Sequence, residues 1–221
     1  ALAIHTAALE ILEKTGFKME HPGALEMLSG AGCKVTKDGW VRMPAFLAED
    51  AVRSAPRKIT LYDQTGTKAM PLVDDQAFYG TGSDATFTLD LKTGQRRRTG
   101  IADVANFAKL VDGLENIAFA MSMANPEDVP VEAIYVHVFA EMVKHTNKPI
   151  VFIADSGKDI AKIYEIACVV AGGEDLLQRK PFILNYSEAI SPLRFPENVM
   201  EKLIFCAKKQ IPICFPSGSN A

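Results

Sequence analysis

Residues 149–155 read Pro-Ile-Val-Phe-Ile-Ala-Asp, an apolar run of strand length that ends at a carboxylate. Amphipathic patterns with helical spacing flank this run, over residues 131–145 before it and 159–171 after it. A strand that is apolar throughout is buried on both faces, which is typical of parallel strands connected by helices. The stretch therefore predicts a helix–strand–helix segment of an α/β protein.

The same unit recurs along the chain. Apolar runs that include Ile117, Ile150, Phe182 and Ile211 are spaced by 33, 32 and 29 residues, the length of a βαβ unit. Both an open Rossmann-type sheet and a barrel fit this alternation. Polar or small residues end several of the runs, and a barrel gathers its site from the ends of many strands. We therefore predict a (β/α)8 TIM-type barrel that is incomplete, with about five of the eight strands that closure requires.

The region before the repeat has a different pattern. Residues 2–15, 22–30 and 44–52 have helical character, the Asp38-Gly39 pair predicts a hairpin, and residues 58–62 alternate as a strand. We predict two domains: an N-terminal α+β cap over 1–72, helical with a hairpin, and the first part of a barrel over 73–221. Both ends of the chain look cut, and we expect the sequence to be part of a longer gene product.

A second group of predictions concerns a basic hairpin and the first residues of two helices. An apolar segment that begins at residue 77 is expected to continue through residues 86–89 into a basic hairpin. Thr99 is a candidate cap for a helix over 101–114, and Pro196 stands where the first position of a helix favours proline. The basic run of residues 96–98 fits either a solvated hairpin tip or a site for a phosphate or a partner.

Composition excludes several classes of function. The 221 residues are 48% hydrophobic with a formal net charge of -3, so the basic field of a nucleic-acid-binding protein is missing. No apolar run approaches the roughly 18 residues of a membrane span, and no signal-peptide pattern opens the chain. The four cysteines are scattered and are typical of a reducing compartment. We expect a cytoplasmic protein without a nucleic-acid or membrane partner.

The sequence supports none of three chemical sites: a dinucleotide site, a metal site and a serine nucleophile. Gly80-Thr-Gly-Ser-Asp-Ala85 matches the outline of a dinucleotide fingerprint, but a strand pattern follows it instead of a helix that could hold a pyrophosphate. The four histidines lack the spacing of metal ligands, so we predict no metal site. The G-x-S-x-G elbow of a serine nucleophile is absent.

Polar residues at the predicted strand ends form the candidate substrate site. Carboxylates at such ends collect at the mouth of a barrel, although a helix cap or a loop hydrogen bond is the alternative for each. Tyrosines there are often core residues with a solvated hydroxyl, yet several around a pocket would form a cage for a quaternary ammonium ion. Spacing alone gives no residue a catalytic role. The candidate substrate-binding residues are Tyr79, Gly82, Asp84, Ser122, Asn125, Asp155, Asn185, Tyr186, Glu188 and Ser217.

Four stretches carry a resemblance to a known family. They are residues 4–16 (IHTAALEILEKTG), 30–35 (GAGCKV), 55–61 (APRKITL) and 81–85 (TGSDA). With them, the whole chain resembles the trimethylamine and glycine betaine methyltransferases that methylate corrinoid proteins. The resemblance implies a barrel whose mouth binds a small methylated amine and passes a methyl group to the cobalt of a corrinoid. It also implies that this enzyme binds no cofactor directly, because a separate corrinoid protein carries the cobamide.

The resemblance leaves the branch of the family open. Members that act on trimethylamine look to carry pyrrolysine in a later strand, beyond residue 221, and members resembling the betaine enzymes lack it. We also expect a homo-oligomer. Two other functions remain possible from the residues: a barrel lyase or aldolase that uses strand-end carboxylates as acid and base, and an inactive scaffold or binding module. A Schiff-base enzyme would need a lysine at a strand end, and Lys148, Lys158 and Lys180 fall in loops or at helix ends.

Overall fold

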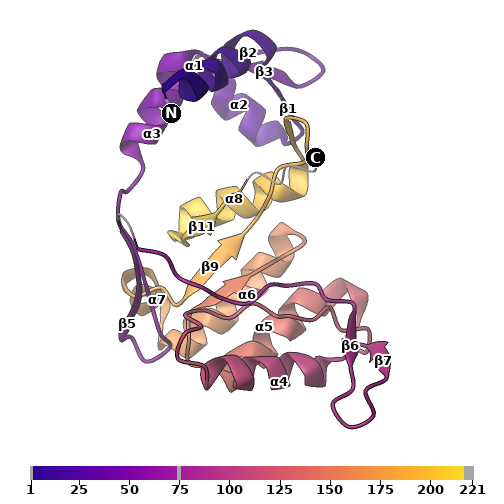
Figure 1. Cartoon of the computed structure of the whole chain (residues 1–221). Coiled ribbons are helices and arrows are strands. Elements are labelled where there is room, and N and C mark those ends of the chain that lie inside the picture. The colour runs from indigo at the N-terminus through magenta and orange to yellow at the C-terminus, as the bar shows by residue number, and fades with distance from the viewer. Residues whose placement is uncertain (1, 74–75, 217–221) are drawn as a thin grey trace. The chain divides into compact units, whose positions relative to one another are not determined.

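A computed structural model describes residues 2–73 and 76–216 (Figure 1). Internal contacts divide these residues into two compact units. The smaller unit contains residues 2–57, 187–204 and 215–216, and the larger contains 58–73, 76–186 and 205–214. The division differs from the predicted boundary after residue 72, because residues 58–72 belong to the larger unit and a late segment belongs to the smaller one.

In the described residues, the smaller unit combines several helices with a four-stranded sheet. The sheet has the order β10-β1-β3-β2, in which only the β1–β10 pair is parallel. The predicted helices and the hairpin at Asp38-Gly39 are confirmed, whereas the pairing of β10 with β1 was not predicted. The elements are α1 (Leu2–Glu10), the π-helical η1 (Ile11–Thr15), β1 (Phe17–Met19), α2 (Pro22–Gly30), β2 (Lys34–Val35), β3 (Trp40–Arg42), α3 (Ala45–Ser54) and β10 (Arg194–Phe195).

Local chemistry explains why these elements begin and pack as they do. The Nδ1 atom of His21 accepts a hydrogen bond from the amide of Ala24 at 3.1 Å and so caps the N-terminus of α2. Phe17, Met19 and Val41 come from facing strands and form the buried centre of the unit. The ring of Phe195 contacts that of Phe17 edge-on, with centroids 5.2 Å apart, so β10 completes this core.

The larger unit is built on parallel strands that lie in chain order. β8 (Ile150–Phe152), β9 (Ile183–Tyr186) and β11 (Ile213–Cys214) pair in parallel in the order β11-β9-β8. Two parallel bridges, Ala120 to Ile150 and Gly80 to Phe119, extend this arrangement by two earlier segments. The chain is therefore a mixed α/β protein with consecutive parallel neighbours, and its described residues form no closed barrel.

Two of the predicted strands are shorter than expected. Instead of continuous strands, the segment that begins at residue 77 forms one bridge at Gly80, and the segment 117–121 forms isolated bridges at Phe119 and Ala120. At Gly80 a Cβ atom would lie 2.3 Å from the ring of Phe119, so the backbone passes closer to that ring than any other residue allows. The hydroxyl of Thr81 then accepts from the amide of Met121 at 2.7 Å and replaces a backbone partner of the ladder.

Helices connect the parallel segments as the periodicity predicts. One addition, α7, follows α6 and was not predicted. The helices are α4 (Ile101–Asp112), the 3-10 turn η2 (Val131–Ala133) that leads into α5 (Ile134–His145), α6 (Gly157–Ala171), α7 (Glu174–Arg179) and α8 (Glu197–Lys209). Residues 197–204 of α8 belong to the smaller unit and residues 205–209 to the larger. No helix within 2–73 and 76–216 is long and apolar enough to cross a membrane.

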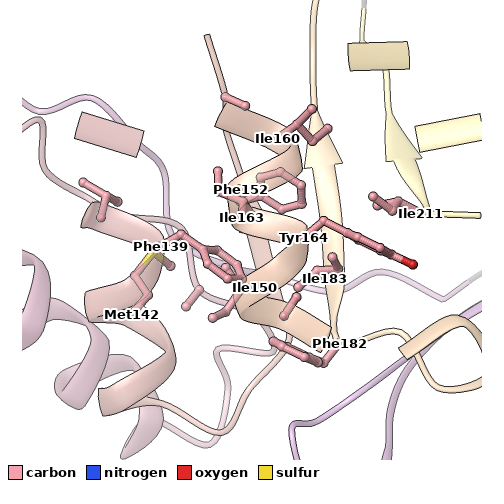
Figure 2. Close-up of a cluster of buried hydrophobic side chains, with 14 of the residues drawn as sticks. Phe139, Met142, Ile150, Phe152, Ile160, Ile163, Tyr164, Phe182, Ile183 and Ile211 are labelled. Atoms are coloured by element: carbon pink, nitrogen blue, oxygen red, sulfur yellow. The ribbon is translucent and has the colours of Figure 1, made fainter. Parts of the chain in front are cut away.

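The main core of the larger unit lies between α5, α6 and one face of the parallel strands. Ile150, Phe152 and Ile183 alternate along their strands, so their side chains share this face. The rings of Phe139 and Phe152 meet edge-on with centroids 5.7 Å apart. Figure 2 shows these side chains filling the space between helix and strand.

The opposite face of the same strands is covered by an antiparallel hairpin. Its strands are β4 (Ile59–Tyr62) and β5 (Lys68–Leu72), and Leu61 and Met70 are a directly paired position. Both side chains are buried against Val151 and Leu184. A second hairpin, β6 (Phe87–Leu89) with β7 (Arg96–Arg98), confirms the basic hairpin, with the arginines on its returning strand and not at its tip.

Two predicted helix starts need correction. Thr99 does not cap α4, because its hydroxyl lies 2.9 Å from the carbonyl oxygens of both Ala85 and Asn125 and binds there instead. The carboxylate of Asp103 accepts from the amide of Gly100 at 2.9 Å and performs the capping. Pro196 immediately precedes α8 and its carbonyl accepts from the amide of Met200, so it does not occupy the first helical position.

Candidate functional site

The segment 79–85 runs beside the segment 118–125 and builds one wall of the candidate site. The amide of Ala118 donates to the carbonyl of Tyr79 at 2.7 Å, that of Met123 to Gly82 at 2.9 Å, and that of Asn125 to Ala85 at 3.0 Å. The two segments therefore leave the carboxyl ends of neighbouring parallel strands together, so their polar side chains share one place.

Backbone strain marks this wall. Asp84 has φ 64° and Met123 has φ 56°, the left-handed region that residues other than glycine rarely adopt. Such conformations cost roughly 1–3 kcal/mol each and gather at binding and catalytic sites. The hydroxyl of Ser83 donates to the Asp84 carboxylate at 2.7 Å and helps to fix its position.

A pocket opens between this wall, β8 and α5. Its lining combines apolar and polar side chains. The enclosed space is about 20 Å³, room for one water molecule. Together with the open space at its mouth the void measures about 370 Å³. The lining residues are Ser83, Asp84, Met121, Ser122, Ala124, Asn125, Ile134, Tyr135, Val138, Phe139, Met142, Val151, Phe152 and Ile153.

Tyr135 is one of three aromatic residues that line this pocket, with Phe139 and Phe152. Burial raises the pKa of its phenol, and the negative charges of Asp84, Asp155 and Asp159 raise it further. The hydroxyl therefore stays protonated at neutral pH and the ring stays uncharged. Asp84 and Asp155 follow two different parallel segments, and Asp159 lies in the first turn of α6. The three carboxylates therefore bring negative charge near the phenol.

The structure brings together part of the predicted site. Asp84, Ser122 and Asn125 line the pocket, and Gly82 lies in its wall. Asp155 is exposed at the end of β8 and close enough to influence Tyr135. The capping of α6, one of the two alternative roles for Asp155, belongs to Ser156 and Asp159, whose side chains bind each other's backbone amides.

Three other candidates lie outside the pocket lining. Asn185 is fully buried in β9, and Tyr186 packs with Val151 and Leu184 on the strand face that the β4–β5 hairpin covers. Glu188 is exposed in the smaller unit. Ser217 lies outside the described residues.

Tyr79 lies at the opposite end of the parallel strands. It is 73% exposed and lines a broad second hollow with residues that precede the strands, among them Lys148 and Pro149. The ammonium of Lys148 donates to the carbonyls of Val111, Leu114 and Ile117 at 2.7, 2.5 and 2.6 Å. It neutralises the C-terminal end of α4, so this lysine has a structural role.

Sequence reasoning missed Tyr135. The helix over 131–145 was assigned an inward face with Ile134, Val138, Phe139 and Met142, and Tyr135 is spaced three and seven residues from Val138 and Met142. That spacing places it on the same face, one turn nearer the helix start. A tyrosine at the first turn of a helix that follows a polar strand end was the available signal.

Comparison with known proteins identifies the family of the chain. The family model described as trimethylamine methyltransferase (MTTB) matches residues 1–219. The chain therefore belongs to the trimethylamine methyltransferase family. It is 30% identical over 212 residues to the trimethylamine methyltransferase MttB of Desulfitobacterium hafniense (strain DSM 10664 / DCB-2), covering 96% of this chain and 43% of that protein.

Two other relatives have the same extent. The glycine betaine methyltransferase of Desulfitobacterium hafniense (strain Y51) is 28% identical over 206 residues, which cover 93% of this chain and 43% of that protein. The trimethylamine methyltransferase MttB of Methanosarcina barkeri is 26% identical over 220 residues, 96% of this chain and 44% of that protein. The chain thus spans less than half the length of these relatives.

Proposed function

We propose that this chain is part of an enzyme that takes a methyl group from a tertiary or quaternary methylated amine, of the trimethylamine or glycine betaine type. The match to the family over residues 1–219 carries the proposal. We further propose that the acceptor is the cobalt of a corrinoid on a separate protein, and that the larger unit is the first part of a (β/α)8 barrel. The chain order of the parallel segments supports the barrel, since an open doubly wound sheet reverses its order.

The pocket mouth has the chemistry that a methylated ammonium ion requires. Such an ion offers few or no N–H donors, so aromatic faces and nearby negative charge must attract it. Tyr135 supplies an uncharged ring, and Asp84 and Asp155 supply the charge. Because the enclosed space holds about one water molecule, the amine would lie at the mouth of the pocket, with its methyl groups toward the apolar lining residues.

The chemistry asks little more of these residues than binding and orientation. Once a quaternary nitrogen loses a methyl group it leaves as a neutral amine, so no proton has to be moved to the leaving group. The site then has to hold the N–CH3 bond in line with the acceptor and keep water away from it. A phenol that stays protonated suits this role.

A binding experiment tests the amine site. Calorimetric titration of the full-length protein with glycine betaine and with its tert-butyl analogue compares two carboxylates of the same shape, of which only betaine carries a positive charge. We expect betaine to bind at least tenfold more tightly. Tyr135→Leu should weaken betaine binding by about threefold to thirtyfold, the range of a cation–π contact, and Asp84→Asn should weaken it as well.

The control is Glu26→Gln, which removes an exposed carboxylate from α2 in the smaller unit. It should bind both ligands as the wild type does. Equal affinities of the wild type for betaine and for its tert-butyl analogue would contradict the site. A corrinoid protein that gains no methyl group from a bound amine would contradict the acceptor. The cytoplasmic location and the homo-oligomer stay predictions from the sequence.

A further inference from the structure

The β6–β7 hairpin adjoins the pocket. Asn125, which lines the pocket, donates its amide to the carbonyl of Ala85 at the start of the hairpin. Thr99 closes the hairpin at its other end, donates its amide to Thr86, and buries its hydroxyl between the carbonyls of Ala85 and Asn125. The hairpin is therefore anchored at the mouth of the pocket, and Figure 1 shows it extending outward beyond α4.

The register separates the hairpin into two faces. Phe87 pairs with Arg98, Thr88 with Arg97, and Leu89 with Arg96. Side chains alternate along a strand, so Arg97 and Thr88 share one face. Arg97 on that face forms two hydrogen bonds to the carboxylate of Asp103, at 2.7 and 2.8 Å, which hold the hairpin to α4.

The other face, which we call the outer face, consists of Phe87, Leu89, Arg96 and Arg98. Both guanidinium groups stack on the ring of Phe87, at 3.6 Å for Arg96 and 4.5 Å for Arg98. Stacking orders these long side chains before any partner binds, which lowers the entropic cost of binding. Leu89 is 63% exposed, and Leu91 at the tip, which we count with the outer face, is fully exposed.

The hairpin is cationic in an acidic chain. Residues 86–99 contain Lys92 and three arginines against the single carboxylate of Asp90, while the whole chain has a formal net charge of -3. Arg97 is neutralised by Asp103 and Asp90, and Arg98 lies 3.6 Å from Glu127. Arg96 and Lys92 thus dominate the charge that a partner would meet.

We infer that the outer face of the β6–β7 hairpin docks an acidic surface of the methyl-accepting corrinoid protein. This inference rests on the proposed function. Ordered arginines beside an aromatic ring and exposed leucines are the residues that dominate the energy of protein interfaces. Their apolar share favours a protein over a phosphate or a nucleic acid, and their anchor at the pocket mouth is where a methyl acceptor must approach.

A charge-reversal experiment tests the docking face. Arg96→Glu combined with Arg98→Glu changes only exposed side chains. Purified corrinoid proteins of the source organism, assayed singly by surface plasmon resonance, are the probes. We expect the double variant to bind its partner at least tenfold more weakly at low salt, mostly through slower association, and we expect the difference to shrink as salt is added.

The matched control is Arg57→Glu, a charge reversal at an exposed arginine of the smaller unit, which should change affinity less than twofold. Leu91→Asp is a second variant that tests the apolar part of the face, with an expected loss of threefold or more. Betaine binding by all variants, measured separately, should match the wild type, and a wild type that fails to bind betaine would count against the proposed function and not against docking.

Three results would overturn the inference. The first is unchanged partner affinity in both hairpin variants. The second is a loss of self-association, measured by analytical ultracentrifugation, without a loss of partner binding, which would assign the face to a second copy of the chain. The third is a loss of binding to heparin or DNA only, which would assign it to polyanions.

Discussion

Two hairpins in the larger unit have similar lengths, but the apolar side chains of one are buried and those of the other are exposed. In β4–β5, Leu61 is 0% exposed and Met70 is nearly as buried, and both pack on the parallel strands. In β6–β7, the apolar residues of the outer face remain exposed and arginines stack beside them. An isolated two-stranded hairpin is marginally stable in water, so each needs an anchor. The first uses hydrophobic burial, and the second uses the ion pair of Arg97 with Asp103.

The difference separates stability from recognition. Because burial supplies most of the free energy of folding, changes in the first hairpin should act on stability. Changes in the outer face of the second should act on binding and leave stability nearly unaltered. The following predictions test this division with the free energy of unfolding.

Leu61→Ala should have the largest effect. Removing a fully buried leucine side chain costs the lost transfer energy and leaves a cavity against Val151 and Leu184, about 2–5 kcal/mol in all. Urea denaturation followed by circular dichroism measures the loss. A loss below about 1 kcal/mol would show that the β4–β5 hairpin does not stabilise the parallel strands as the packing implies.

Asp103→Asn should have an intermediate effect that depends on pH. The hydrogen bonds from Arg97 hold the pKa of the Asp103 carboxyl below its ordinary value, against the opposing effect of burial. The carboxylate also caps α4, so we expect a loss of about 1–2 kcal/mol at pH 7.

The sign of the pH dependence follows from the lowered pKa. The stabilisation is complete above the unfolded-state pKa of about 3.9 and is lost as the pH falls through the folded-state pKa. The difference between wild type and Asp103→Asn should therefore be smaller at pH 3 than at pH 7. Glu165→Gln, which breaks an exposed ion pair with Lys162, is the control and should change little at either pH. A difference that is constant with pH would contradict the role of the charge.

Phe87→Leu should have a small effect on stability. It keeps an apolar side chain but removes the ring on which Arg96 and Arg98 stack, a loss of about 0.5–1 kcal/mol at an exposed site. Phe46→Leu on α3 is the matched control at another exposed phenylalanine. If the two variants unfold at the same urea concentration as the wild type, the stacking contributes order to the arginines without net stability.

Leu91→Ser should have the smallest effect, within about 0.5 kcal/mol of the wild type, because its side chain is exposed in the folded protein. Differential scanning calorimetry gives the comparison. A clear destabilisation would mean that Leu91 is covered in the folded protein, which would contradict its assignment to a free docking face.

Much of the fold could be predicted because its signals are local. Helical periodicity located α4, α5 and α6, and the Asp38-Gly39 pair located a hairpin, since residues near in sequence decide these elements. The parallel pairing of β10 with β1 joins residues 18 and 194, and no local pattern could predict it. The missed cap at Asp103 has the same cause, because Thr99 is occupied by carbonyls that only the folded chain brings near.

The sequence predicted those site residues whose strand ends it located correctly. Asp84, Ser122 and Asn125 follow apolar runs and lie together. Tyr79 was predicted at the carboxyl end of a strand. The parallel bridge of its segment is at Gly80, so the tyrosine precedes the bridge instead of following the strand. Tyr135 could have been predicted only by extending the inward face of the helix to its first turn.

Lys148 has a consequence for chemical reactivity. An amine is a nucleophile only when its lone pair is available, and the three protons of this ammonium each have a carbonyl acceptor. Reagents that acylate or reductively alkylate lysines should therefore modify Lys148 much later than Lys92 at the hairpin tip. The order of labelling reports whether the end of α4 is intact. Because the protein has a single tryptophan as a fluorescent probe of folding, this order could serve as a second footprint of the native state.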